Sequence, residues 1–564
     1  MSVVDALARL YPWPVEASDE LGDALAFVES GHDPETVVRA GYVAGCLATV
    51  LSTPLVLSPL PLWGSLLSVL AVGLCVTHGV HSSPHLLAAV RRTRALGDTP
   101  ALIGRIVLRM GIQPATESAV RFGAETGEGP LAASLADHVD RAAGTPRTGL
   151  LSFAEEWADR FPAVRRSAHL VVSAGSAPEG ERTRTLDRAL AAVLDGTRDG
   201  MAEFTAKIRG PATGLYAFGV MLPLALVALV PAATMAGYPV SIWVFVLVYN
   251  LLLPAMLVAV GTWLLVRRPV AFPPPAVTRA HPDVPDRTWP PIVAGLGVAV
   301  GGFVAIGHLG SAVLAPIAAV GLGLGVALTG VYHPVATVRG HVRDVEEHLV
   351  DALYLIGRQV AEGESVESAI DHAGDRVPGE TGDVFADAAG LQRRLHLGVY
   401  DAFLGPYGSL ADVPSPRARS TASLLAIAAE EGQPAGHAIV SMADHLEELG
   451  EVERETRRQL SAVTDTLENT ASIFGPMVAG STVALAGGMV GSGAEAADAA
   501  TLPTDALAVV VGIYVLTLAV VLTTVSVGLR YGLDRSLVGY RVGRTLTAAT
   551  AIYVCSVIVA GAFV

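Results

Sequence analysis

Lysine is almost absent from this sequence. Of its 38 basic residues, only Lys207 is a lysine, and all the others are arginines. The residue after Lys207 is Ile208, so no GxxxxGK[ST] loop, the phosphate-binding signature of the commonest nucleotide hydrolases, can be written anywhere. The chain therefore lacks its own P-loop, and any ATP-driven work that it takes part in must come from a separate ATPase.

Cysteines and charged residues are also scarce. The three cysteines, Cys46, Cys75 and Cys555, lie far apart inside apolar stretches, where they are interpreted as small apolar residues, and they offer neither a disulfide framework nor a zinc site. Charged residues make up 16% of the chain, against about a quarter in soluble proteins. With a mean hydropathy of +0.50, this composition excludes an ordinary soluble protein.

The apolar residues are gathered into long blocks. A helix needs about 20 apolar residues to cross a bilayer core. Nine blocks without Asp, Glu, Lys or Arg predict nine transmembrane helices, at 41–60, 62–80, 212–236, 242–266, 292–306, 311–331, 471–491, 506–529 and 546–564. The fifth is short unless it extends through Gly307 and His308. No signal peptide is expected, because about forty acidic, amphipathic residues precede the first block.

The basic residues predict the orientation in the membrane. All 38 lie in the N-terminal segment 1–40 and in 82–211, 267–291, 333–470 and 530–545, and nine alternating spans put all of these segments on one side. Because Lys and Arg favour the cytoplasmic side, we expect a multi-pass cell-membrane protein with a cytoplasmic N-terminus and an extracellular C-terminus. Segment 267–291 is then a linker, and 530–545 a basic cytoplasmic loop.

Two of the polar segments are large enough to form domains. Segment 82–211 has 17 basic and 15 acidic residues, a net charge of +2, whereas 333–470 has 11 and 24, a net charge of −13. Apolar residues recur at helical spacing in both, as in the stripe from Val345 to Val360 and the one from Leu186 to Leu194. A third stripe, from Ile439 to Leu467, predicts a helix that continues into the seventh span. We expect two cytoplasmic helical bundles.

The two segments resemble each other at a shift of roughly 250 residues. The tetrapeptide at 102–105, Leu-Ile-Gly-Arg, recurs at 355–358, and Glu-Ser-Ala at 117–119 recurs at 367–369. Arg-Ser at 166–167 matches 419–420, and Phe-Gly-Val-Met at 218–221 resembles Phe-Gly-Pro-Met at 474–477. Four matches in one order predict an internal duplication of two spans, a helical domain and two spans, followed by a ninth span.

The run AAEEGQPAGHAIVSMADHLEEL at 428–449, its degenerate counterpart at 174–194, and the helix that enters the membrane at 473–476 carry a family resemblance. The chain resembles the type II secretion system F-domain family, in particular the archaeal FlaJ-, TadC- and PilC-like platform proteins of type IV pilus and archaellum machinery. The resemblance implies a non-enzymatic membrane platform without a cofactor. It also implies a hexameric secretion ATPase and pilin- or archaellin-like subunits as partners, and no nucleic acid.

Arginine clusters are candidate docking sites for such an ATPase, because charge complementarity guides association. The candidates are Arg165, Arg166, Arg182, Arg184, Arg188, Arg393, Arg394, Arg454, Arg457 and Arg458. The alternative is that they are solvated helix faces, with the last three paired to neighbouring glutamates at i,i+4 spacing. Arg91, Arg92 and Arg94 are interpreted as docking residues or as anchors that flank the membrane.

Two further positions are singled out by the resemblance. Glu430, Glu431 and Gly432 begin a turn with a structural or partner-binding role, or form a helix end without function. Gly475 and Pro476 stand where the long helix enters the membrane, and we expect them to couple domain movement to the seventh span.

Histidines and glycines offer weaker candidates. His78, His81 and His85 have a spacing that suits a metal, but Pro84 is expected to interrupt their helix and no carboxylate or cysteine accompanies them, so no metal is predicted. His341, Glu347 and His348 are interpreted in the same way. GxxxG pairs at 297–301, 321–325 and 487–491 favour close helix packing, either inside the bundle or in a homodimer.

The alternative to the platform is a duplicated transporter of unknown solute; a receptor is disfavoured by its short outside loops. The absence of Asp, Glu, Lys and Arg from the spans argues against an ion-coupled carrier, where buried charges mark the pathway. The acidic, arginine-rich composition suggests a salt-adapted archaeon, although GC-rich coding also favours arginine.

Overall fold

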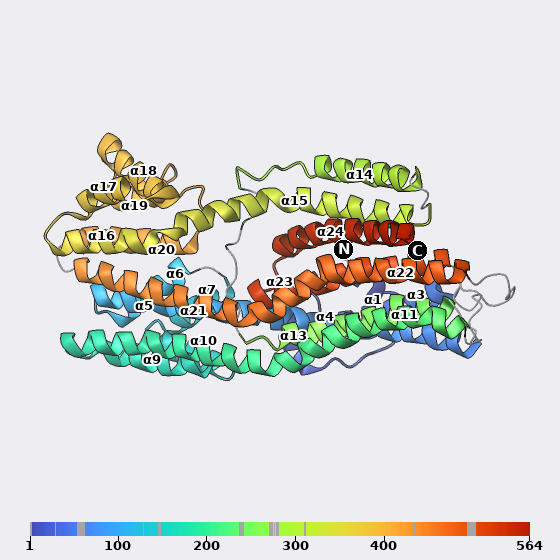
Figure 1. The fold of residues 1–564 in the computed structure, drawn as a ribbon. Coiled ribbons are helices and arrows are strands. Elements are labelled where there is room, and N and C mark those ends of the chain that lie inside the picture. Colours follow the sequence, from blue (N-terminus) through green and yellow to red (C-terminus); the bar gives the residue numbers. More distant parts are fainter. Residues whose placement is uncertain are drawn as a thin grey trace.

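The computed structural model of the chain describes residues 3–28, 30–53, 62–127, 129–144, 148–235, 242–269, 275, 277, 281–308, 312–431, 435–492 and 504–563. Every regular element in these ranges is a helix, so the expected all-helical class is confirmed. Figure 1 shows an elongated molecule, with short helices gathered at one end and long, nearly parallel helices at the other.

The end with the short helices contains two series. The first series is α5 (Thr99–Ile112), α6 (Thr116–Thr126), α7 (Pro130–Ala142), α8 (Gly149–Ala158), α9 (Pro162–Gly175) and α10 (Glu179–Tyr216). The second series is α16 (Leu349–Ala361), α17 (Val366–Arg376), α18 (Gly379–Leu395), α19 (Val399–Leu404), α20 (Pro416–Glu431) and α21 (Ala435–Asn469). Each series ends in a helix at least twice as long as the others.

Local sequence explains where many of these helices begin. α7, α9 and α20 each start with a proline, whose fixed φ suits the first helical turn and whose missing N–H costs nothing there. The Ser365 side chain accepts a hydrogen bond from Ser368 N at 3.2 Å and caps α17. The predicted apolar stripes are buried: Leu349, Ala352, Leu353, Ile356 and Val360 are at most 5% exposed.

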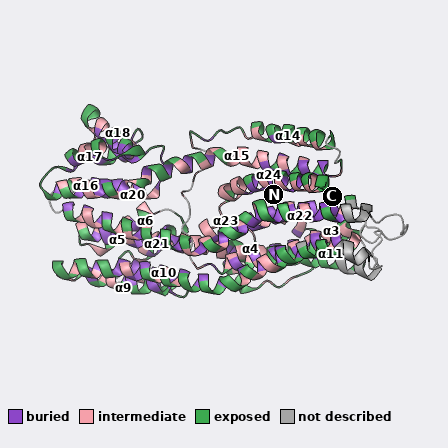
Figure 2. Cartoon of the chain, viewed as in Figure 1, coloured by how far each residue is buried: buried purple, intermediate pink, exposed green. Residues whose placement is uncertain are grey.

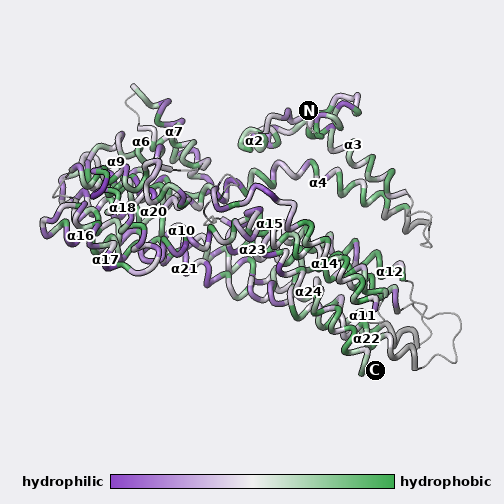
Figure 3. The backbone as a smooth tube through the Cα atoms, turned by 90° about the horizontal axis from the view of Figure 1, so that it is seen from above, coloured by the Kyte–Doolittle hydropathy of each residue, from purple (hydrophilic) through white to green (hydrophobic). Residues whose placement is uncertain are grey.

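The other end is built from long apolar helices. Its elements are α3 (Pro34–Ser52), α4 (Leu62–Gly97), α11 (Leu222–Met235), α12 (Ile242–Leu247), α13 (Leu253–Val266), α14 (Trp289–His308), α15 (Ala315–Glu347), α22 (Gly475–Ser492), α23 (Thr504–Tyr531) and α24 (Arg535–Phe563). The five-residue π-helical segments η2 (Ala217–Met221), η3 (Val248–Leu252) and η4 (Thr470–Phe474) join some of them. The short helices α1 (Val3–Ala8) and α2 (Asp19–Phe27) precede α3, and Figure 3 shows α2 to α4 at one side of the molecule.

Seven helices in the described part are long and apolar enough to cross a membrane. They lie at Glu179–Leu229, Ile242–Val266, Trp289–His308, Ala315–Ala361, Gly436–Gly487, Asp505–Tyr531 and Arg535–Phe563. These seven overlap the predicted third to ninth spans. The predicted first span falls partly on α3, with 54–60 outside the described residues, and the second falls on α4. Neither helix is among the seven, so the described residues support a membrane protein with seven candidate spans.

Large apolar side chains are exposed over this end of the molecule. Leu229, Trp289 and Val300 are 61%, 59% and 65% exposed. Figure 2 shows α14 and α11 with mostly exposed residues, and Figure 3 shows the same helices as hydrophobic. A contiguous apolar surface of this kind is stable in contact with lipid and unstable in water, which agrees with a membrane location.

Three helical paths connect the polar end with the apolar end, two of them unbroken and one with a single turn residue. α10 continues through η2 into α11, α21 continues through η4 into α22, and α15 leads into α16 with only His348 between them. The helix predicted to continue into the seventh span is therefore confirmed, with a π-helical segment at the junction.

Three local predictions need correction or completion. Pro84 does not interrupt its helix, because α4 runs from Leu62 to Gly97 and the Ser83 hydroxyl donates to Val80 O at 2.8 Å, the carbonyl that the missing N–H of Pro84 leaves free. The basic loop expected at 530–545 is mostly helical, since α23 ends at Tyr531 and α24 begins at Arg535. The fifth span does extend to His308, and the turn at 309–311 lies outside the described residues.

The apolar cores of the two series differ in their continuity. The core of the first series forms one cluster with buried residues of the membrane helices, such as Leu257 and Tyr514. The core of the second series is a separate cluster, to which α5 of the first series contributes Leu108. The two series also meet where α21 packs on α10, with Arg198 Nη1 3.8 Å from Glu448 Oε1.

Candidate functional site

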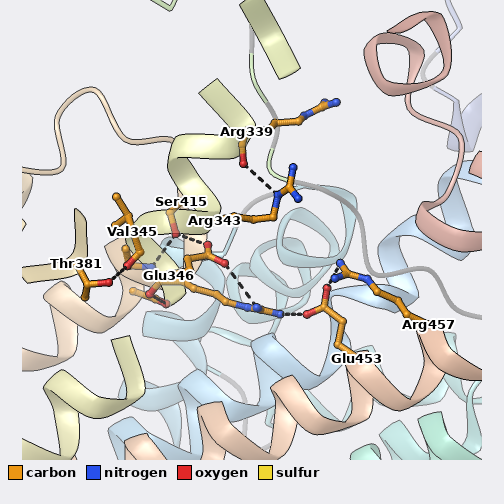
Figure 4. A network of polar contacts seen from close by, with 11 residues as sticks. Arg339, Arg343, Val345, Glu346, Thr381, Ser415, Glu453 and Arg457 are labelled. Atoms are coloured by element: carbon orange, nitrogen blue, oxygen red, sulfur yellow. Dashed lines mark hydrogen bonds and ion pairs between the residues drawn. The ribbon is translucent and has the colours of Figure 1, made fainter. Parts of the chain in front are cut away.

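A chain of ion pairs connects α15 with α20 and α21 of the second series (Figure 4). Arg417, in the first turn of α20, pairs with Glu453 of α21, and its Nη1 lies 3.6 Å from Glu346 Oε2 of α15. Glu453 also pairs with Arg457, one helical turn further along α21. The carboxylate side chains are 16% exposed at Glu346 and 11% at Glu453, so the pairs are shielded from water.

Serine and threonine hydroxyls extend this network to the backbone. The Ser415 hydroxyl donates to Glu346 Oε1 at 2.5 Å and accepts from Ala418 N at 3.0 Å, which caps α20. The buried Thr381 hydroxyl donates to Val345 O at 2.8 Å, and His348 N donates to Thr381 Oγ1 at 3.2 Å. These bonds satisfy backbone groups where α15 passes into α16.

The electrostatics of the network favour charged carboxylates. Burial alone raises the pKa of Glu453, but the guanidinium groups of Arg417 and Arg457 outweigh burial and hold that pKa below its ordinary value. Glu453 is therefore ionised at neutral pH, as a buried ion-pair network requires.

A second buried ion pair joins α15 to the membrane helices. The guanidinium of Arg339 lies 2.9 Å from Asp534 Oδ1, and these side chains are 6% and 14% exposed. Asp534 also caps α24, because its Oδ1 accepts from Ser536 N and Leu537 N at 3.0 Å each. With the Arg417 network this pair fixes α15 between α20, α21 and the short connection from α23 to α24. The arrangement is suited to holding helices together or moving them together.

The predicted arginine clusters lie in three separate places. Four arginines are exposed on the α9–α10 hairpin: Arg165, Arg166, Arg184 and Arg188. Arg165 Nη2 lies 2.9 Å from Glu155 Oε2. Arg182 is half-buried, and its guanidinium donates a hydrogen bond to Ala177 O. Arg393 and Arg394 are exposed at the end of α18, with Arg393 paired to Asp371. The structure thus brings only the α9–α10 group together.

The cluster on α21 divides into two kinds of residue. Arg457 pairs with Glu453, so the expected i,i+4 pairing is confirmed for this residue. Its guanidinium carbon, Cζ, lies 5.4 Å from the ring centre of Tyr531. Arg454 and Arg458 are exposed, and no described carboxylate lies within ion-pair distance of either. Only these two remain available to a partner.

The predicted turn is described in part. Glu430 is exposed near the C-terminus of α20, where α20 ends at Glu431, and Gly432 lies outside the described residues. Gly475 and Pro476 are buried at the start of α22, directly after η4. A Cβ at Gly475 would lie 2.7 Å from Thr470 O and 3.3 Å from Leu518 Cδ2, so this glycine permits the close approach of α23.

The other sequence candidates have ordinary partners. His81 Nε2 lies 3.0 Å from Val38 O, and His78 Nε2 lies 3.3 Å from Ser82 Oγ. His341 and His348 lie within 3.6 Å of Glu380 and Asp351 carboxylate oxygens, respectively. No cluster of three or more potential metal-ligating His, Cys, Asp or Glu side chains occurs in the part of the chain that the structure describes.

The glycine pairs divide between packed and open positions. A Cβ at Gly321 or Gly325 would collide with Thr550 or Thr547, so this pair packs α15 against α24. Gly297 and Gly301 on α14 have no other atom within 4 Å of an added Cβ. The packing interpretation therefore fits the pair on α15, and the pair on α14 is free to contact lipid or another molecule.

Sequence reasoning missed several charges that the structure pairs or buries. Arg417 and Glu346 were not singled out, because they lie about seventy positions apart and nothing local marks them as partners. Arg268, only 3% exposed, was counted as part of a linker. The sequence feature that could have marked Arg268 is its position at the end of the apolar block 242–266.

Comparison of the chain with models of known families, with curated proteins and with solved structures finds no match in any of the three. In the part of the chain that the structure describes, the fold defines an all-helical protein with seven candidate membrane spans and two helical series at one end.

Proposed function

We propose that this protein is a membrane platform of an archaeal type IV pilus-like or archaellum assembly system. In this proposal two cytoplasmic helical domains receive the movement of a separate hexameric secretion ATPase. The membrane helices then pass that movement to pilin- or archaellin-like subunits that enter a filament. The protein itself catalyses no reaction and needs no cofactor.

The observation that carries the proposal is the pair of long helices that connect the two ends of the molecule. The helical path runs through 51 residues at Glu179–Leu229 and through 52 residues at Gly436–Gly487. Such helices transmit displacement because each turn is hydrogen-bonded to the next. Each contains a five-residue π-helical segment where the polar part passes into the apolar part, η2 in one and η4 in the other.

The same pair supports an internal duplication. Both series consist of six helices in one order, and each ends in the long helix with its π-helical segment. η2 begins at Ala217 and η4 at Thr470, which is a shift of 253 positions, the same shift that relates Leu102 to Leu355. We infer two copies of one unit, with nine spans, a cytoplasmic N-terminus and an extracellular C-terminus.

The α9–α10 hairpin is the proposed docking surface for the ATPase. Arg166, Arg184 and Arg188 are exposed there, and the first domain lacks the strong negative charge of the second. Arg454 and Arg458 are secondary candidates, whereas Arg457 is committed to the Glu453 network. A homodimer through the open glycine face of α14 is part of the same proposal.

The test uses the full-length protein in detergent, together with the secretion ATPase from the same genome. Wild-type protein is expected to retain the ATPase on a column and to change its hydrolysis rate. Replacing Arg184 and Arg188 with Glu should reduce retention, because it reverses the charge of the surface, whereas the same change at Arg393 and Arg394 serves as a control for added acidity. If wild-type protein neither retains the ATPase nor alters hydrolysis, the proposal fails.

A second variant separates docking from coupling. Gly475→Leu introduces a side chain against Thr470 O and Leu518, so it should stop filament assembly while the ATPase remains bound. Gly214→Leu is the matched control, because a Cβ there meets no other atom within 4 Å. Equal loss of assembly in both variants would contradict a coupling role for this junction.

A further inference from the structure

A cavity lies where the membrane helices end, next to the two buried ion-pair systems. Leu265 and Arg268 line it at the end of α13, Val90 and Arg94 line it from α4, and the connection that follows α23 closes it with Gly528 and Asp534. Its enclosed part is narrow, and it opens to solvent at its mouth. None of the sites described above accounts for it.

The cavity contains a buried arginine without an acidic partner. Arg268 is 3% exposed; its Nη1 donates to Gly528 O at 2.9 Å and its Nη2 to Arg530 O at 3.4 Å. Its Nε is buried and has no hydrogen-bond partner among the described residues. Since carbonyl groups do not neutralise a guanidinium, a buried charge of this kind is costly unless an anion meets it.

The Asp534 carboxylate lines the same cavity as Arg268 but interacts with other groups. Asp534 lines the cavity, but its Oδ1 pairs with Arg339 at 2.9 Å and accepts two backbone N–H groups of α24. Burial, followed by the charge of Arg457, lowers the pKa of Arg268 to about 9, so the guanidinium keeps its proton at neutral pH. Arg94 adds a second positive charge to the lining, and no described residue forms an ion pair with it.

The position of the cavity relates it to the membrane surface. Leu265 precedes the last residue of the candidate span Ile242–Val266, Gly528 lies near the end of Asp505–Tyr531, and Asp534 directly precedes Arg535–Phe563. Arg267 Cζ lies 4.4 Å from the ring centre of Trp263, and Trp263 is 39% exposed. The guanidinium groups of Arg457 and Arg530 lie over the Tyr531 ring. Exposed tryptophan and arginine at helix ends are typical of the headgroup region.

From this juxtaposition we propose that the cavity binds the phosphate headgroup of an anionic membrane phospholipid. Arg268 and Arg94 bind the phosphate oxygens through charge-assisted hydrogen bonds, with Arg268 Nε among the donors. Val90, Leu265 and Leu533 provide apolar contacts for the glycerol backbone and the first methylenes. A free inorganic phosphate shares the charge chemistry but makes no use of this apolar side. Basic pockets between membrane helices at the cytoplasmic surface bind lipid headgroups in this way.

The bound lipid adds to the hydrogen bonds that already join these elements, from Thr93 Oγ1 to Arg268 O and from Arg268 Nη1 to Gly528 O. It bridges α4 to α13 and to the connection between α23 and α24, where Asp534 and Arg339 fix α15. The proposal does not rest on a pilus function, because it concerns only the charge and shape of this cavity.

The test measures lipid retention by the purified full-length protein with native mass spectrometry, after addition of phosphatidylglycerol, phosphatidylcholine or inorganic phosphate. Wild-type protein should retain phosphatidylglycerol in preference to phosphatidylcholine. Arg94→Gln should weaken this retention about fivefold, since it removes one basic residue near the surface. Arg267→Gln is the matched control, because Arg267 packs on Trp263 and does not line the cavity.

A second variant, Val90→Phe, tests the cavity independently in case Arg94→Gln fails to fold. Val90→Phe fills the cavity without changing any charge, and it should also weaken retention while the melting temperature of the lipid-free protein stays near that of wild type. Equal retention of both lipids, or equal loss in Arg94→Gln and Arg267→Gln, overturns the proposal. Retention of inorganic phosphate that Arg94→Gln abolishes, without preference for phosphatidylglycerol, assigns the cavity to a free anion and overturns the lipid assignment.

Discussion

The two helical series have the same order of helices but stabilise them differently. At a shift of 253 positions, Arg417 corresponds to Val164 and Glu453 to Gly200. Val164 is fully buried in an apolar core, whereas Arg417 and Glu453 form a shielded ion pair. Helix order therefore does not determine how an interior is held together, since hydrophobic packing does so in one series and paired charge assists in the other.

At another pair of positions related by the same shift, the buried charge lies in the first series instead. Arg105, in the Leu-Ile-Gly-Arg run of α5, is 8% exposed, and its counterpart Arg358 in α16 has an 80% exposed side chain that pairs with Glu362. The first series thus buries one arginine that the second exposes. Identical tetrapeptides have different surroundings because the neighbouring helices differ.

The largest expected effect comes from removing the central cation of the second series. Arg417→Met leaves Glu346 and Glu453 with one guanidinium fewer. Because Arg417 is 34% exposed and Arg457 still pairs with Glu453, the loss should cost about 3 kcal/mol of unfolding free energy, the lower end for a buried pair. Thermal unfolding of the purified protein in detergent, with hydrogen exchange of α20 and α21, measures it.

Arg358→Met is the control for this change, because it removes an exposed arginine of the same series and should alter stability by at most about 0.5 kcal/mol. Similar losses for the two variants would show that the network contributes nothing specific.

The next effect compares matched positions in the two series. Arg105→Gln should destabilise the first series by about 1–3 kcal/mol, because it removes a buried charged group that has polar partners there. Arg358→Gln should cost at most about 1 kcal/mol, since an exposed i,i+4 pair contributes little. Denaturant midpoints of the two variants make the measurement, and equal shifts would remove the asymmetry between the series.

Acid should weaken the second series before the first. The pKa of Glu453 is lower in the folded than in the unfolded protein, where it is about 4.3. Its contribution is therefore fully present above about pH 4.3 and is lost as the pH falls through the lower, folded value. Hydrogen exchange of α21 at a series of pH values should show this loss. The effect should be smaller in Glu453→Gln, and an unchanged profile in that variant would assign the acid sensitivity to other groups.

The smallest effects are expected at exposed ion pairs, one in each series. Arg165→Gln removes the pair with Glu155, and Arg393→Gln removes the pair with Asp371. Each should change the melting temperature very little, because surface pairs contribute about 0–1 kcal/mol. A larger loss of ATPase retention for Arg165→Gln than for Arg393→Gln would support docking on the first series; the reverse order would move the docking surface to the second.

Much of the fold was predictable because its causes are local. Blocks of twenty apolar residues predicted the helices at 242–266 and 506–529, and period-3.6 stripes predicted the buried faces around Leu190 and Ile356. The sequence failed at Pro84, where a serine hydroxyl bonds to the carbonyl that proline leaves free. It also treated 535–545 as a loop, because arginines at a membrane boundary look alike in a helix and in a turn.

Hydropathy and periodicity act over one or two helical turns, and they are enough to specify the helical class, the apolar lengths suited to a membrane and the two polar series. Which charges lie next to one another depends instead on the packing of distant helices. Glu346, Arg417 and Glu453 come from three helices, and Arg268, Arg94 and Asp534 line one cavity from three separate segments of the chain. Such partners are chosen by how helices pack, and a pattern along one helix contains no information about its neighbours.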